Sequence, residues 1–339
     1  MKRIALLMTL TAFLTGATWH DSMREMSAKL TELLPNLITP EVFMRAEEKA
    51  ETLKQARALL KMAHDVKELK TAPSSDPQMQ AVLTGLRAQI ESSIKSMESG
   101  RWAHGSRELL SVSRHCIACH SMKLGPERTE FKPDFSNLSA IQQADYYAAT
   151  RQFDRAVVQY EKALANPAWA KNNEERWNEA FIRLLAITVR TRNNPSLTLE
   201  LISRFFDAKT YPQNLKTVAM GWRQQAKEWR KEGSKLPVTL EALRSLVARA
   251  ERAQGTSREP VALIYYLRAS AVAHAYLSAP EHAADAEALY LAGLAAIGLS
   301  AANIWELPET YFKSCVSLKT QSKWTDACSE RLRAADSKG

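Results

Sequence analysis

The residues best suited to chemistry lie in one short run, Cys116-Ile117-Ala118-Cys119-His120. On a helix, two cysteines at this spacing and the histidine that follows them lie on the same side. Each thiol can then add to a vinyl group of haem while the imidazole binds the iron. The spacing therefore predicts one covalent haem c, with thioether bonds to Cys116 and Cys119 and with His120 as the proximal iron ligand.

Two other uses of paired cysteines fit the sequence less well. A redox-active dithiol of the thioredoxin kind has the same spacing, but it does not need His120 and it belongs to a βαβ setting that this sequence lacks. A zinc site needs a second pair of ligands, whereas Cys315 and Cys328 have no flanking histidine. Only haem attachment uses every residue of the motif.

Residues 1–17 have the features of a secretory signal peptide. Lys2 and Arg3 precede an apolar run from Ile4 to Leu14, and small residues suited to cleavage follow at 15–17. The run is shorter than the roughly 20 residues that cross a bilayer, and no later segment is apolar enough to span one. We therefore expect a mature periplasmic protein with no transmembrane anchor.

The composition predicts an all-α protein. The 339 residues include only 11 glycines and 13 prolines, while Ala, Leu, Lys, Arg and Glu are abundant, which favours helix. This length allows about two domains. We expect a haem domain over residues 18–125, a linker over 126–138 and a helical-repeat domain over 139–339.

Four amphipathic helices are expected in the haem domain, because apolar residues recur there every three or four positions. The first runs from Thr18 or His20 to Pro35, and the second runs from Thr39 and Pro40 to Leu69. The third starts at Asp76 and Pro77 and ends at Gly100; the fourth carries the motif and ends at Gly125 and Pro126. Short connections make such helices an antiparallel four-helix bundle.

A bundle of this size with Cys-x-x-Cys-His near the end of its last helix resembles the cytochrome c-prime family, including its low-spin, six-coordinate members. The resemblance covers roughly residues 18–125. It implies a haem inside the bundle, His120 as the proximal ligand and a distal residue from the first helix. In the low-spin members that residue is methionine, and here Met23 and Met26 are the two possibilities.

Spacing favours Met23 over Met26 as the distal ligand. Met23 lies 12 to 14 residues before the expected helix end, and Met26, Leu30 and Leu33 continue its apolar stripe. The stripe indicates the face of the helix but not the depth of the ligand, so Met26 stays the alternative and His20 is a third candidate. Both methionines also suit simple core packing; if neither binds, the iron is five-coordinate and open to small gases.

Three further histidines of this domain are not expected to bind the iron. His115 adjoins the first motif cysteine but lies about 100° around the helix from it, beside the haem edge and away from the iron. His64 and His104 are interpreted as surface or satisfied core residues.

The segment after the linker resembles a tetratricopeptide repeat. Its small, aromatic and terminator positions hold Ala144, Tyr147, Phe153, Ala156, Tyr160, Ala163 and Pro167, the last one place early. Less regular hairpins are expected at 174–192 with 197–206, 215–231 with 240–253, 260–277 with 284–299, and 308–335. The resemblance implies a solenoid of stacked helices, and a generic helical array predicts much the same architecture.

The other two cysteines fall in the last of these hairpins. In the repeat alignment Cys315 takes the small position of the first helix, and Cys328 adjoins Ala327 at the small position of the second, so the two positions face one another. Since the haem takes the motif cysteines, a Cys315–Cys328 disulfide accounts for every thiol of an exported protein. Two buried free cysteines are the alternative.

The net charge of +9 is unevenly placed: 14 basic residues face 6 acidic ones between Arg190 and Arg258. Such an excess is most often a solvated helix face, but it can also dock an acidic protein. An exported protein does not meet nucleic acid, so we expect a protein partner. The expected docking residues are Arg223, Lys227, Arg230 and Lys231.

Together these features predict an exported monohaem c-type cytochrome for electron transfer, whose helical repeats dock a periplasmic redox or complex-forming protein. The alternatives are a haem protein that binds or senses NO or CO, and a haem-containing scaffold of a larger complex. The sequence has no phosphate-binding glycine loop, metalloprotease helix motif or nucleophile elbow, so no independent enzyme activity is predicted.

Overall fold

The computed structural model describes residues 19–38, 45–68, 77–120, 138–149, 152–207, 216–233, 237–300, 307–318 and 320–336. Within these residues the protein has fifteen α-helices, one π-helical turn and no β-strand, which confirms the all-α prediction. The expected signal peptide, the start of the second expected helix at Thr39 and Pro40, and all of the expected linker except Leu138 lie outside the described residues.

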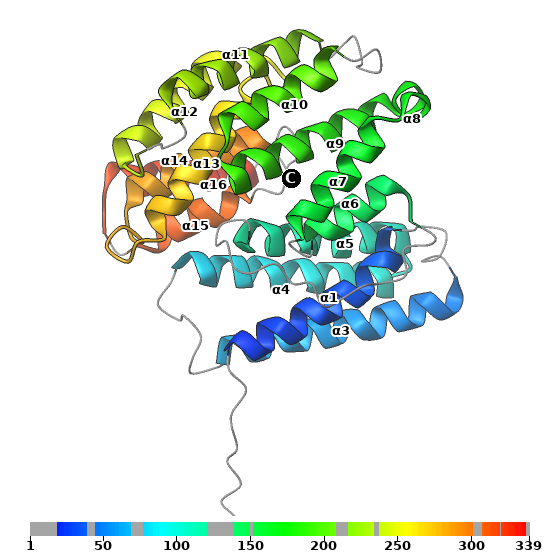
Figure 1. Ribbon diagram of the computed structural model, residues 1–339. Helices are drawn as coiled ribbons and strands as arrows, with labels where there is room; N and C mark the ends of the chain where they lie inside the picture. The colour runs from blue at the N-terminus through cyan, green and yellow to red at the C-terminus, as the bar shows by residue number, and fades with distance from the viewer. Residues whose placement is uncertain are drawn as a thin grey trace, which may run out of the picture.

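Four helices begin the fold. They are α1 (Trp19–Ile38), α3 (Ala46–Glu68), α4 (Pro77–Glu98) and α5 (Trp102–His120). Along the chain α1 packs on α3, α3 on α4 and α4 on α5, and α1 also contacts α5. Successive helices run in opposite directions (Figure 1), so the first half of α1 and the second half of α5 lie toward the same end of this group.

The first helix is longer than predicted. Proline at position 35 does not end α1, which continues to Ile38. Leu34 and Leu37 are buried, with 0% and 4% of their surface exposed. Their burial stabilises the last turn of the helix more than the proline disfavours it, because tertiary packing overrides local propensity.

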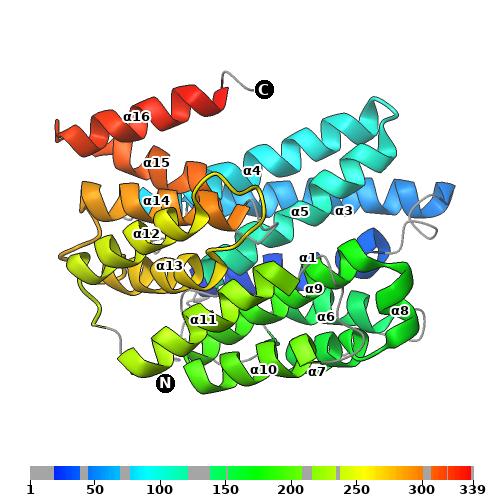
Figure 2. The same cartoon turned by 90° about the horizontal axis from the view of Figure 1, so that it is seen from above.

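The other helices form a curved array above this group (Figures 1 and 2). They are α6 (Ala140–Ala149), α7 (Phe153–Leu164), α8 (Pro167–Asn172), α9 (Glu174–Ile187), α10 (Pro195–Asp207), α11 (Lys216–Glu232), α12 (Leu240–Gln254), α13 (Leu263–Leu277), α14 (Ala286–Ser300), α15 (Pro308–Ser317) and α16 (Lys323–Asp336). A π-helical turn, η1 (Thr188–Arg192), extends α9 toward α10. The start of the array contacts α1 and α5 through α6, and its end contacts α4 through α15.

The segment that resembles a repeat folds as two packed helices. Ala144 of α6 and Ala156 of α7 are fully buried, and α6 packs along α7. The second helix of this unit, α7, ends at Leu164, before Pro167, and Pro167 then starts α8. The side chain of Asn166 accepts a hydrogen bond from the backbone N–H of Trp169 at 3.2 Å, and proline suits the first turn of a capped helix because its missing N–H needs no partner there.

Later helices pair in part differently from the predicted hairpins. α13 packs on α14 and α15 on α16, as expected, but α11 packs mainly on α10, and α12 on α13. The indole of Trp222 on α11 donates to the carbonyl oxygen of Pro260 at 2.7 Å, and Gln225 donates to that of Val261 at 2.6 Å. These bonds connect α11 to the start of α13. The position of α11 is therefore determined by its contacts with α10 and α13 more than by α12, the next helix along the chain.

Candidate functional site

The predicted haem motif lies on the last turns of α5. This helix runs from Trp102 to His120, so Cys116, Cys119 and His120 occupy positions i, i+3 and i+4 of a helical backbone. Residues at these positions share one side of a helix. The side chains of residues 113–120 lie outside the described residues. The backbone through His120 therefore fits the arrangement that covalent haem attachment needs.

A carboxylate in the middle of α5 joins this helix to α4. Glu108 accepts hydrogen bonds from the hydroxyls of Ser92, at 2.7 Å, and Ser96, at 2.9 Å. Partial burial alone would raise the pKa of Glu108, but these bonds and the nearby His104 and Arg101 bring it below its ordinary value. The contact fixes the register of the motif helix against α4.

α4 and α5 approach closely at Gly105. The buried hydroxyl of Ser93 donates to the carbonyl oxygen of Gly105 at 2.7 Å. A Cβ atom at Gly105 would lie 2.8 Å from the carbonyl oxygen of Ser93 and would also collide with the side chain of Met97. Only glycine allows this approach, so a second contact, one turn before Glu108, holds α5 against α4.

Two polar contacts show which residues of α1, α3 and α5 lie side by side, at the same height along the helix group. The amide of Asn36 on α1 donates to Glu48 on α3 at 3.0 Å. The ammonium of Lys49, the next residue of α3, lies 5.5 Å from the ring centre of Trp102 at the start of α5. From this level the first half of α1 and the rest of α5 extend toward the same end of the helix group.

The rise per residue of a helix then gives the height of each candidate distal ligand along α1, which can be compared with the height of the motif along α5. At 1.5 Å per residue, Met26 lies ~15 Å from the Asn36 level, Met23 ~20 Å and His20 ~24 Å. On the same scale Cys116 lies ~21 Å and Cys119 ~26 Å beyond Trp102. Met23 and His20 are therefore nearer than Met26 to the level of the motif.

The first helix presents a continuous apolar side to the core. Met26, Leu30, Leu33 and Leu37 are all buried, each 4% exposed or less. Their spacing is the one that the sequence predicts for the core-facing stripe of α1. The side chains of Met23 and His20 lie outside the described residues. Met23 is assigned to this stripe from the position of its backbone on α1, three residues before Met26.

His64 and His104 lie at the surface, about half exposed. The Nε2 atom of His64 is 3.3 Å from a carboxylate oxygen of Glu91, and that of His104 is 3.5 Å from Glu108. This agrees with their interpretation as surface residues. The side chain of His115 lies outside the described residues.

The predicted docking residues lie on α11, but they are not equivalent. Lys227, Arg230 and Lys231 are exposed. Arg223 is partly buried: its guanidinium lies 5.6 Å from the ring centre of Phe206 and 4.0 Å from a carboxylate oxygen of Asp207. Arg223 therefore contributes to the packing of α10 on α11 and offers less free charge than the other three.

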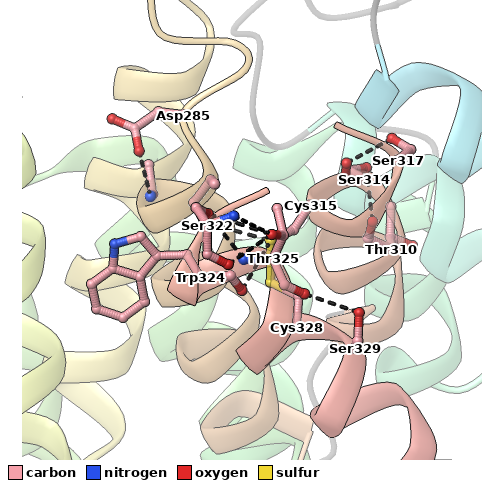
Figure 3. Close-up of a disulfide and its surroundings, with 12 residues drawn as sticks. Asp285, Thr310, Ser314, Cys315, Ser317, Ser322, Trp324, Thr325, Cys328 and Ser329 are labelled. Carbon is pink, nitrogen blue, oxygen red and sulfur yellow. Dashed lines mark hydrogen bonds between the residues drawn. A yellow bond between two sulfur atoms is a disulfide. The ribbon is translucent and has the colours of Figure 1, made fainter. Parts of the chain in front are cut away.

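Cys315 on α15 and Cys328 on α16 form a disulfide (Figure 3). Their Cα atoms are 6.3 Å apart and both residues are fully buried. This is the pairing predicted from the sequence. Because α15 also contacts α4, the disulfide stabilises the hairpin that joins the end of the array to the first four helices.

Two polar clusters in the helical array were not predicted from sequence. In the first, Asp145 of α6 accepts hydrogen bonds from the hydroxyl of Tyr160 at 2.6 Å and from Arg183 of α9 at 2.7 Å. Burial, with the charge of Asp145, raises the pKa of Tyr160 well above its ordinary value. Of these three residues, only Asp145 could have been noticed in the sequence, because it is the one charged residue of the segment 140–149.

The second cluster joins α11, α12 and α13. Glu232 of α11 pairs with Arg249 of α12 at 2.6 Å and with Arg268 of α13 at 2.7 Å. Arg268 is only 1% exposed, and its guanidinium lies 5.1 Å from the ring centre of Trp229. The position of Arg268 within the apolar run 260–277 could have indicated this cluster, because a buried charge needs a partner of opposite charge.

Among the described residues, no helix is long and apolar enough to cross a bilayer, and no group of three or more His, Cys, Asp or Glu could hold a metal ion. The chain matches no family model, no curated protein and no solved structure. The candidate site therefore depends on the motif and on the helices that position it.

Proposed function

We propose that the protein is an exported monohaem c-type cytochrome that transfers electrons. The observation that carries this proposal is Cys-x-x-Cys-His at 116–120 on the final turns of α5, a helix held in register by α4. Cys116 and Cys119 would form the thioether bonds, and His120 would bind the iron. Haem c supplies reversible one-electron chemistry when bound.

We also propose that α1, α3, α4 and α5 act as a four-helix haem bundle of the cytochrome c-prime type. Their alternating directions and their mutual contacts support this assignment. The later helices, α6 to α16, would then form a solenoid similar to tetratricopeptide repeats. The buried Ala144 and Ala156 at the crossing of α6 and α7 support that part.

In this proposal Met23 is the distal ligand. Its level along α1 lies nearer to the motif than that of Met26, and it continues the buried stripe of α1. A thioether ligand on the iron would close the distal side to small gases and raise the reduction potential. Met23 therefore favours electron transfer over the alternative of NO or CO binding.

Optical spectroscopy of the holoprotein and two matched variants tests this function. Electron transfer predicts a low-spin spectrum, with no CO binding by the reduced protein. Met23→Ala should give a high-spin spectrum and CO binding, while Met26→Ala, the control on the same stripe, should stay low-spin. A wild-type protein that is high-spin and binds CO readily would instead support the gas-binding alternative. A spectrum changed only in Met26→Ala would assign the ligand to Met26.

A further inference from the structure

Both acidic residues of α11 pair with arginines of neighbouring helices, although each of their side chains is about one-third exposed. Glu228 pairs with Arg249 at 3.0 Å and accepts a short hydrogen bond from Tyr265, which holds the pKa of Glu228 below its ordinary value. Glu232 pairs with Arg249 and with the buried Arg268. Neither carboxylate of α11 therefore balances the basic residues on its outer side.

The exposed side of α11 carries a lysine at its start and three basic residues near its end. Lys216, Met220, Lys227 and Lys231 follow one another at intervals of four, seven and four residues, and all are exposed. Such spacing places them in one stripe, about 22 Å long at 1.5 Å per residue. No carboxylate among the described residues pairs with Lys227, Arg230 or Lys231.

A cleft adjoins this stripe at Arg230. Its volume is about 440 Å³, and residues 192–196 and Arg230 line it. Arg192 pairs with Asp154, and the side chain of Asn194 caps α10 by accepting from the N–H groups of Ser196 and Leu197. Among the residues that the structure describes, no carboxylate pairs with the guanidinium of Arg230 on the wall of the cleft, and no lining residue is acidic.

We infer that this face, formed by Lys227, Arg230, Lys231 and the adjoining cleft, docks an acidic segment of a partner protein. Lysine ammonium groups along the stripe would pair with successive carboxylates, and one carboxylate would enter the cleft beside Arg230, where a guanidinium can bind it with two parallel hydrogen bonds. Exposed Met220 would contribute apolar contact. Charge complementarity selects this occupant, because the face offers cations for which the described part of the chain supplies no carboxylate partner.

The position of the face adds a functional consequence, which rests on the proposed function. In Figure 1 α11 lies at the edge of the array farthest from α3, and α11 packs on α10 and α13. A partner bound there would leave α1 and α3 uncovered. Docking at α11 would therefore tether the cytochrome to a complex while the haem bundle stays accessible to a second redox protein.

Fluorescence anisotropy with a defined probe tests the inference. The probe is a short labelled peptide of alternating glutamate and aspartate, and the protein is the full holoprotein. Lys227→Glu/Arg230→Glu/Lys231→Glu should weaken peptide binding by about tenfold or more, since three ion pairs are replaced by repulsion. The matched control, Lys171→Glu/Arg258→Glu/Arg331→Glu, makes the same change in net charge at scattered exposed positions, and it should weaken binding by much less.

Equal weakening by both triple variants would overturn the inference, because the effect would then follow net charge alone. So would the absence of peptide binding, or binding that prefers vesicles rich in anionic phospholipid, which would assign the face to a lipid surface. Circular dichroism checks that both variants fold. The haem spectrum is recorded separately, so a failed docking test leaves the proposed haem function untouched, and the reverse also holds.

Discussion

The carboxylate of Glu108 on α5 accepts a hydrogen bond of 2.7 Å from the hydroxyl of Ser92 on α4. Ser96, one turn further along α4, donates to the other carboxylate oxygen at 2.9 Å. Glu108 is thus held by two hydroxyls of a neighbouring helix, and it lies two turns before the haem motif. This contact makes the position of the motif depend on α4.

Removing this carboxylate should loosen α5. Glu108→Ala is expected to lower the free energy of unfolding by about 1–2 kcal/mol, because two hydrogen bonds to a charged acceptor are lost at a partly buried site. Thermal unfolding followed by circular dichroism measures the change. Arg107→Ala, at an exposed neighbouring position of the same helix, is the control and should alter stability by less than about 0.5 kcal/mol. Equal effects of the two variants would contradict the proposed register contact.

The same contact predicts a dependence of stability on pH. The pKa of Glu108 is lower in the folded protein than in the unfolded chain, so its contribution is present above the unfolded value of about 4.3. That contribution is lost as pH falls through the folded pKa. Glu108→Gln should therefore lose less stability than the wild type between about pH 5 and pH 3. Parallel stability curves for the two proteins would exclude this role.

Substitutions in the partly buried cluster around Asp145 should lower stability more than substitutions in the exposed ion pairs. Asp145→Ala leaves Arg183 and the hydroxyl of Tyr160 without their shared acceptor, and we expect a loss of about 2–4 kcal/mol. Tyr160→Phe removes only one of the two hydrogen bonds and should cost about 1 kcal/mol. Urea unfolding of both variants shows which one loses more of the free energy of unfolding. A larger loss for Tyr160→Phe would show that the Arg183–Asp145 pair contributes little.

Local features of the fold could be predicted from sequence, and contacts between distant segments could not. The expected bounds of α3, α4 and α13 lie close to the observed ones wherever the structure describes them, because apolar periodicity and turn residues act within a few positions. The position of α11, in contrast, depends on bonds to the start of α13, such as that between Trp222 and Pro260. No short sequence pattern encodes a contact across 38 positions.

In the candidate site, too, the local features could be predicted from sequence and the contacts between helices could not. Cys116, Cys119 and His120 could be recognised because their spacing is local to one stretch of helix. The distal ligand depends on how far α1 is displaced along α5, which only contacts such as Asn36 with Glu48 and Lys49 with Trp102 reveal. Ser92 and Glu108 were missed because serine and glutamate are common on exposed helix faces and their meeting is a tertiary event.

The disulfide and the haem motif together predict the number of free thiols. With thioether bonds at Cys116 and Cys119 and a disulfide between Cys315 and Cys328, the unfolded holoprotein should react with no thiol reagent before reduction and at two positions after it. Reduction should also lower the free energy of unfolding by about 3 kcal/mol, as expected for a loop of this size. Alkylation followed by mass spectrometry identifies the positions. Labelling of Cys315 or Cys328 without reduction would disprove the disulfide in solution.

A c-type cytochrome must hold its haem by covalent bonds that survive denaturation. The protein should be expressed in the periplasm of a host with a c-type haem attachment system, denatured, and examined by intact-mass measurement and peptide mapping. We predict that one haem remains bound after denaturation, linked to the peptide that contains Cys116 and Cys119. The double variant Cys116→Ala/Cys119→Ala should retain none, while Cys315→Ala/Cys328→Ala should retain haem as the wild type does. A wild-type protein that carries no covalent haem, with both motif cysteines free or joined in a disulfide, would contradict the account.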